Sequence, residues 1–204
     1  MLIKLRDYER VFQIISAVVE SEEGNPAHAC IHYSLFGANI LTDHFKIDAK
    51  VRCGMAIYHL GDEHQVLCFG EETPSGVTST NEGFHCWVEA DGWLIDFMAP
   101  EFGALKKTVF TARPRMFQKR VSDMAEHPND MTRAGEFFLT HSPDISQEIL
   151  TPIVDHLRIQ DLANLCSQWF KKTPRKIRTS VATADQNGKI RPVTLKPVKI
   201  ISNW

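Results

Sequence analysis

Apolar residues recur at helical spacing near the start of the chain. In residues 3–21 they repeat every three to four positions, which predicts an amphipathic helix with Leu5, Tyr8, Phe12, Ile15 and Val19 on its buried face. A second helix is expected to begin at Asn25-Pro26, a good N-cap and first-turn pair. Its apolar stripe extends from Ala29 to Leu41. Cys30 therefore lies near the helix start, on the inward face.

Beyond residue 46 the pattern changes to short runs rich in β-branched and aromatic residues, separated by turn signals. These runs predict antiparallel strands at Ile47–Leu60, Gln65–Gly70, Phe84–Ala90 and Trp93–Met98, with a further strand at Lys107–Thr111. The polar segment Glu71–Gly83 is expected to be a loop.

The C-terminal third alternates again between helical and strand patterns. Helices are expected over residues 144–157 and 160–172, with Pro152 kinking the first. Asn187-Gly188 marks a terminal hairpin between Ile177–Ala182 and Ile190–Ile201. The elements together predict an α+β fold in which N-terminal helices pack on an antiparallel sheet, followed by C-terminal helices and a β-hairpin.

The segment His85-Cys86-Trp87 and the later Asp96 form the most informative pattern in the chain. Asp91-Gly92 is a two-residue turn signal, so the strands on either side of it are expected to pair as a hairpin. In that register Trp87 faces Asp96, and His85 and Asp96 are diagonal neighbours on one face, roughly 7–8 Å apart at the backbone. Cys86 is expected to face away from His85 because strand side chains alternate.

Composition indicates a soluble globular protein. The chain has 204 residues, 43% of them hydrophobic and 24% charged, and a net charge of −2, which gives no overall attraction to nucleic acid or membrane. Five cysteines without a Cys-x-x-Cys pair favour reduced thiols over a disulfide framework. We find no signal peptide and no run of membrane-spanning length, so we expect a cytoplasmic protein.

Charge is unevenly distributed along the chain. From Lys171 onward nine Lys or Arg residues face one acid, Asp185, which leaves the tail at +8 and the rest at −10. A tail that is solvated or docked on the acidic body is the simplest interpretation, and we do not expect a nucleic-acid partner.

Cys30, His85 and Asp96 can supply the three roles of a cysteine nucleophile site. A thiol attacks an acyl carbon as thiolate, which a helix N-terminus and an imidazolium stabilise. The imidazole takes up the thiol proton and later returns it to the leaving group, while a carboxylate fixes the ring orientation.

A helix-borne cysteine, then a strand, then His-x-Trp and an Asp on the next strand resembles the transglutaminase-like and arylamine N-acetyltransferase-like branch of the papain-like cysteine-enzyme superfamily. Residues 45–54 are also similar to the helix-to-strand segment of those proteins, and the resemblance covers roughly residues 24–100. It implies Cys30 as nucleophile, His85 as general base and acid, Asp96 as orienting carboxylate and Trp87 packed behind the histidine. We expect no cofactor and no catalytic metal.

A chain of this length can bury one core, so we expect a single domain over residues 1–204, with a catalytic core at about 24–115, a helical extension at 116–172 and a basic hairpin at 173–204. The expected activity is acyl transfer from a small-molecule or peptide substrate through a thioester, to water or to an amine. The Cys30 N–H is the natural first oxyanion donor, and Asn25 is either the second donor or only the helix cap.

Two alternatives belong to other functional classes. A non-catalytic module on the same fold would use the basic tail to contact an acidic partner. His28 and His32, four residues apart on a helix, have the spacing of a metal site, or either could line the cleft beside Cys30.

Overall fold

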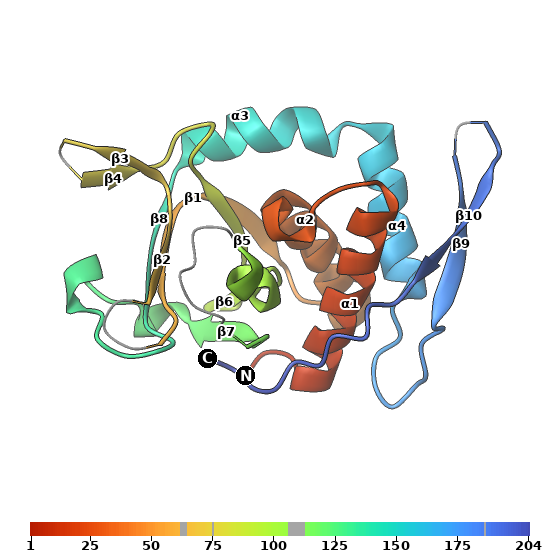
Figure 1. The fold of residues 1–204 in the computed structure, drawn as a ribbon, viewed down its shortest axis with the longest axis horizontal. Helices are drawn as coiled ribbons and strands as arrows, with labels where there is room; N and C mark the ends of the chain where they lie inside the picture. Colours follow the sequence, from red (N-terminus) through yellow and green to blue (C-terminus); the bar gives the residue numbers. More distant parts are fainter. Residues whose placement is uncertain (62–64, 75, 106–112, 186) are drawn as a thin grey trace.

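Helices from both ends of the chain pack against one antiparallel sheet, which confirms the predicted α+β class (Figure 1). The structure is a computed structural model that describes residues 1–61, 65–74, 76–105, 113–185 and 187–204. The sheet has the order β2-β1-β5-β6-β7, with β8 also paired to β1. Its strands are β1 (Lys50–His59), β2 (Val66–Phe69), β5 (His85–Ala90), β6 (Trp93–Asp96), β7 (Phe117–Arg120) and β8 (Phe137–His141).

β1 is the hub of this sheet because it pairs with three other strands. Its first half pairs with β5, and its second half pairs with β2 and β8. Gly54 lies where β8 approaches most closely, and a Cβ there would come within 2.0 Å of the Thr140 carbonyl oxygen. Glycine at this position therefore permits the β1–β8 pairing that closes one side of the sheet.

The N-terminal helices follow the predicted order but differ in their boundaries. α1 spans Leu5–Ser21, and the second predicted helix is divided into a 3₁₀ helix, η1 (Pro26–His28), and α2 (Cys30–Ile40), which continues into a π turn, η2 (Leu41–Phe45). α2 packs against α1, α4 (Leu157–Trp169) and β5. The prediction of one continuous helix from Asn25 is wrong because Ala29, with φ −111° and ψ 32°, interrupts it.

α3 (Pro143–Val154) lies across the β1 end of the sheet (Figure 1). The Ser142 hydroxyl accepts a hydrogen bond from the Ile145 N–H at 3.3 Å and caps the helix. Ser146 ties the helix to β1, since its hydroxyl accepts from the Cys53 N–H at 3.0 Å. Both predicted C-terminal helices are present, and both end about three residues earlier than the pattern suggested.

The middle of the chain differs most from expectation. The predicted loop after β2 contains a small hairpin, β3 (Glu71–Thr73) with β4 (Gly76–Thr78), and the weakly periodic region contributes β7 and β8. Short 3₁₀ helices complete this region: η3 (Ala99–Ala104), η4 (Val121–Asp123) and η5 (Pro128–Asp130). The strand expected at Lys107–Thr111 lies outside the described residues.

The basic tail is attached to the body of the protein. β9 (Ser180–Ala184) and β10 (Ile190–Thr194) form the predicted hairpin, which projects beside α4 (Figure 1). The expected continuation of its second strand to Ile201 is wrong: the Ile200 N–H donates to Glu9 at 2.8 Å instead, so the chain follows α1. It ends beside β7, where Met116 and Asn203 form a parallel bridge. Across the described ranges, we find no helix of sufficient length and apolarity to span a membrane.

Candidate active site

The β5–β6 hairpin brings His85 and Asp96 together, as its sequence predicts. Asp91 and Gly92 both have positive φ, 50° and 73°, which a two-residue turn of this hand requires. Ala90 pairs with Trp93, so the register is the expected one. The His85 Nε2–H donates to Asp96 Oδ2 at 2.6 Å, and both side chains are buried.

Three further hydrogen bonds hold Asp96 in place. The Tyr58 hydroxyl donates to Oδ2 at 2.8 Å, and the Met98 N–H donates to Oδ1 at 3.0 Å. The Tyr8 hydroxyl donates to the Asp96 backbone carbonyl. Both carboxylate oxygens therefore have donors, which offsets the cost of burying this group away from water.

Aromatic side chains enclose the His85 ring. Phe69 stacks on it with ring centroids 4.0 Å apart and an interplanar angle of 18°. Tyr58 meets the ring edge-on at 5.9 Å, and Phe102 lies 6.1 Å away. The enclosure restricts rotation of the imidazole and excludes water from it.

The charge state of His85 follows from these surroundings. Burial lowers the pKa of the imidazole, but the Asp96 carboxylate raises it by charge and by hydrogen bonding. Interaction with the Cys30 sulfur raises it further, and the resulting pKa is about 10. The ring is therefore an imidazolium at neutral pH.

Cys30 is the first residue of α2, because the helix starts anew after Ala29. This position places the sulfur at the positive end of the helix dipole. A helix beginning at Asn25 would instead have placed Cys30 in the second turn, where that effect has faded. The Cys30 side chain is half-buried, whereas His85 is fully buried behind it.

Several neighbours stabilise the Cys30 thiolate. The pKa of the thiol lies well below its usual range, chiefly because the Cys86 side chain interacts with it, while burial opposes the shift. His85 lowers the pKa by a polar interaction and by its charge, and the Cys86 backbone contributes too. His85 Nε2 is bound to Asp96, so Nδ1 is the nitrogen left to interact with Cys30.

The other predicted site residues are more scattered. Asn25 is exposed, and its side-chain oxygen accepts from the Ala27 N–H at 3.1 Å, so it caps η1. His28 is exposed too, whereas His32 is half-buried. Burial lowers the pKa of His32, and the charge of Cys30 opposes that shift. Trp87 is buried and its indole N–H donates to Glu89 at 3.1 Å.

Within the part of the chain that the structure describes, no group of three or more His, Cys, Asp or Glu side chains is arranged to hold a metal ion. The pair His28 and His32 therefore has no third protein ligand there.

Two features of the site have no local signal in the sequence. Tyr58 and Phe69 come from other strands, and only the pairing of β1 with β2 and β5 brings them to His85. Cys86 lies on the strand face opposite His85, as alternation predicts, yet its thiol contacts Cys30. Packing of α2 on β5 brings Cys30 to Cys86, which the sequence pattern did not indicate.

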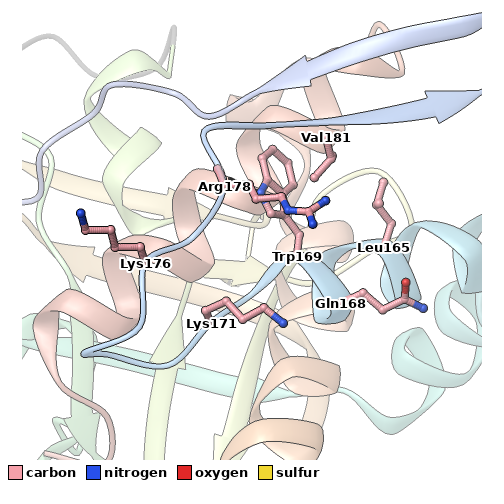
Figure 2. Close-up of a pocket in the computed structure, with 7 residues that line it drawn as sticks. All are labelled: Leu165, Gln168, Trp169, Lys171, Lys176, Arg178 and Val181. Carbon is pink, nitrogen blue, oxygen red and sulfur yellow. Dashed lines mark hydrogen bonds between the residues drawn. The ribbon is translucent and has the colours of Figure 1, made fainter.

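A second, basic surface lies between α4 and the tail. A cavity of about 340 Å³ is lined by Leu165, Gln168, Trp169, Lys171, Lys176, Arg178 and Val181. Figure 2 shows these side chains around the Trp169 indole, whose N–H donates to the Arg178 carbonyl at 2.9 Å. The three cationic side chains are exposed, and no carboxylate is part of the lining.

Comparison with known proteins identifies the family. Residues 4–204 match the family described as "Protein of unknown function (DUF2026)", and the chain belongs to that family. Its fold is similar to that in a solved structure named "The crystal structure of genomics APC5867", with 37% sequence identity and a TM-score of 0.91. The match covers 100% of this chain and 98% of that one. No curated protein matches the chain.

Proposed function

We propose that the protein is a thiol-dependent acyl-transfer enzyme with Cys30 as nucleophile, His85 as general base and acid, and Asp96 as orienting carboxylate. One observation carries the proposal: a buried imidazole hydrogen-bonds to a carboxylate through Nε2 and interacts with a thiol at a helix N-terminus. Buried ionisable groups are costly, and such paired groups with strongly shifted pKa values occur most often at functional sites.

In the first half of the reaction the Cys30 thiolate attacks the acyl carbon of an amide or ester. The His85 imidazolium gives its Nδ1 proton to the departing amine or alcohol, and a thioester forms on Cys30. In the second half, neutral His85 accepts a proton from water or an amine, which attacks the thioester. Asp96 keeps the Nε2–H in place throughout, so that Nδ1 stays directed at the reacting groups.

Negative charge on the acyl oxygen needs hydrogen-bond donors. The first N–H groups of an α-helix have no partner within the helix, so the Cys30 N–H is one such donor. Asn25 remains the candidate for a second donor, because its cap on η1 uses only the side-chain oxygen.

The arrangement supports the resemblance noted in the sequence. A nucleophile helix packed on an antiparallel sheet, with His and Asp on neighbouring strands, is similar to the transglutaminase-like and arylamine N-acetyltransferase-like branch of the papain-like superfamily. We therefore propose a small-molecule or peptide acyl donor as substrate, and chemistry carried by protein side chains alone.

Alkylation of the protein with iodoacetamide tests the nucleophile. Peptide mapping by mass spectrometry at a series of pH values gives the rate at each cysteine. We expect Cys30 to react well below the pH at which an ordinary thiol, with a pKa of about 8.5, begins to ionise. Because the pKa of Cys30 is lowered, its thiolate persists as the pH falls, and the alkylation rate declines only when the pH passes below that pKa.

An assay of substrate turnover completes the test of the proposed function. A panel of activated esters, peptide amides and glutamine-containing peptides, with and without added amine, should reveal acyl release that Cys30→Ser abolishes. Cys68→Ser, a change on β2 outside the triad, is the matched control and should retain activity. Equal alkylation rates at Cys30 and Cys68 across the pH series would contradict the proposal.

A binding function is the second candidate, and the basic cavity beside α4 is the observation that favours it. Such a module would associate with an acidic partner through Lys171, Lys176 and Arg178 without using Cys30.

A further inference from the structure

Three of the five cysteines form a continuous row of thiols. The Cys86 side chain interacts with Cys30 on one side and with Cys53 on the other. Cys53 and Cys86 are direct partners in the β1–β5 ladder, so their side chains project from the same face of the sheet. All three are free thiols. We call Cys30, Cys86 and Cys53 the thiol row.

The packing of α2 explains how the row arises. Alternation along β5 places Cys86 on the face opposite His85, and α2 covers β5 with Cys30 as its first residue. Cys30 therefore interacts with a base, His85, and with a thiol, Cys86. In acyl transfer Cys86 only helps to stabilise the Cys30 thiolate, so its own sulfur forms no bond in the proposed reaction.

Exposure distinguishes the members of the row. Cys30 is half-buried, whereas Cys86 and Cys53 are completely buried. A small oxidant from solvent therefore meets Cys30 first. Burial also raises the pKa of the Cys86 thiol, as does its proximity to Cys30, so Cys86 stays protonated beside the Cys30 thiolate.

We propose that Cys30 is a site of reversible oxidation by peroxides, and that Cys86 is its resolving cysteine, closing a Cys30–Cys86 disulfide. The inference rests on the nucleophilic Cys30 of the proposed function and adds a partner thiol and a class of oxidant to it. The disulfide would switch off acyl transfer and would protect Cys30 from irreversible oxidation.

The chemistry balances with hydrogen peroxide as the oxidant. The Cys30 thiolate attacks one peroxide oxygen, the O–O bond breaks, and the departing hydroxide takes a proton from the His85 imidazolium to become water. Cys30 is now a sulfenic acid. The Cys86 sulfur then attacks the Cys30 sulfur, the S–O bond breaks, and hydroxide leaves with the Cys86 proton as a second water. Two thiol sulfurs are oxidised and one peroxide is reduced.

The interaction between the two side chains favours the second step. A disulfide requires the sulfurs to approach to a bond length of about 2.05 Å, with adjustment of the side-chain torsions. Cys53 is separated from Cys30 by Cys86, so it is not expected to resolve the sulfenic acid first. Cys86→Ser and Cys53→Ser are therefore a matched pair of variants: the first removes the expected resolving thiol, and the second removes the thiol beyond it.

The experiment treats reduced full-length protein with equimolar hydrogen peroxide, quenches it with iodoacetamide and maps the peptides without reductant. We expect a Cys30–Cys86 cross-linked peptide, loss of two free thiols per chain, and full recovery of both with dithiothreitol. Cys53→Ser should form the same cross-link. Cys86→Ser should instead accumulate dimedone-reactive sulfenic acid and sulfinic acid at Cys30.

Wild-type protein that carries only sulfenic or sulfinic acid at Cys30, with no cross-link, would overturn the inference, and so would a cross-link confined to Cys53 and Cys86. The wild-type map decides the question even if a variant fails to fold. The readout is independent of turnover: a cross-link without any acyl transfer would count against the proposed function alone, and turnover without a cross-link would count against this inference alone.

Discussion

Tyr58 and His85 donate hydrogen bonds to the same oxygen of Asp96. The Tyr58 hydroxyl lies 2.8 Å from Asp96 Oδ2, and His85 Nε2 lies 2.6 Å from it. The two donors come from neighbouring strands, β1 and β5, and their rings meet edge-on. Tyr58 thus acts on the His85–Asp96 pair from outside it, by fixing the carboxylate to which the imidazole is bound.

Tyr58→Phe removes this donor but keeps the ring. A hydrogen bond to a charged group contributes about 1.5–3 kcal/mol, so the free energy of unfolding should fall by about that amount. Looser positioning of His85 should also slow alkylation of Cys30. Chemical denaturation and the iodoacetamide rate measure the two effects. Tyr33→Phe, at a buried tyrosine stacked on Phe12, is the matched control and should leave the alkylation rate unchanged.

Asp96→Asn should lower the pKa of His85. Burial of the ring lowers that pKa, and the Asp96 carboxylate, together with Cys30, raises it to about 10, so loss of the carboxylate charge removes the largest raising contribution. The imidazole should then titrate well below the wild-type pKa of about 10. NMR of ¹³C-labelled histidine reports the change directly. If the His85 ring of the variant still titrates near the wild-type pKa, Asp96 does not stabilise the positive charge of the imidazolium.

The same variant should reduce turnover by roughly a hundredfold to ten-thousandfold, because a neutral amide no longer fixes the tautomer or stabilises the imidazolium. Alkylation of Cys30 should fall at acidic pH in particular, since the thiolate loses its cationic partner. Asp91→Asn, at the exposed hairpin turn, is a matched control and should behave as wild type in both assays.

Gly37→Ala should disturb the site from about two turns further along α2, on the same helix face as Cys30. A Cβ at this position would lie 2.3 Å from the Phe97 ring, which is buried and stacks on Tyr8. Overpacking of a dense core costs about 1–3 kcal/mol, more than the roughly 1 kcal/mol that alanine adds as a helix former. We expect a net loss of stability and slower Cys30 alkylation, because Phe97 directly follows Asp96. Adding Phe97→Leu should restore part of the stability and part of the Cys30 alkylation rate.

The half of the site that depends on local geometry could be predicted from the sequence. A two-residue turn determines the register of its hairpin, and the register determines that His85 and Asp96 share a face. The position of Cys30 near a helix start was also readable, but the break at Ala29 was not. A 3₁₀ turn followed by a new helix shows the same apolar stripe as one continuous helix, so periodicity alone does not locate the boundary.

The remainder depends on pairing between distant segments. The contact of Cys86 with Cys30 requires knowing which sheet face α2 covers, and no spacing along β5 shows it. β7 and β8 were missed because their short sequences lack a clear alternation. The end of the tail was misread as a strand because its apolar residues pack on α1 and β7 and do not extend the hairpin.

The basic cavity allows the binding hypothesis to be tested separately from catalysis. Lys171, Lys176 and Arg178 are exposed around it, so we expect weak binding of an acidic peptide such as fluorescent polyglutamate, falling as salt screens the charges. Exposed ion pairs contribute about 0.2–1 kcal/mol each, so reversing all three to Glu should weaken binding at least about threefold. Fluorescence anisotropy at increasing salt measures this.

A charge-matched control separates the cavity from net charge. Lys4, Lys46 and Lys50 are exposed elsewhere, and reversing them to Glu changes the charge by the same amount. If both triple variants lose binding equally, the attraction comes from overall charge, and the cavity is not a recognition site. If only the cavity variant loses binding while Cys30 alkylation stays at the wild-type rate, the two functions occupy separate surfaces, and the basic tail contributes to binding without contributing to the chemistry at Cys30.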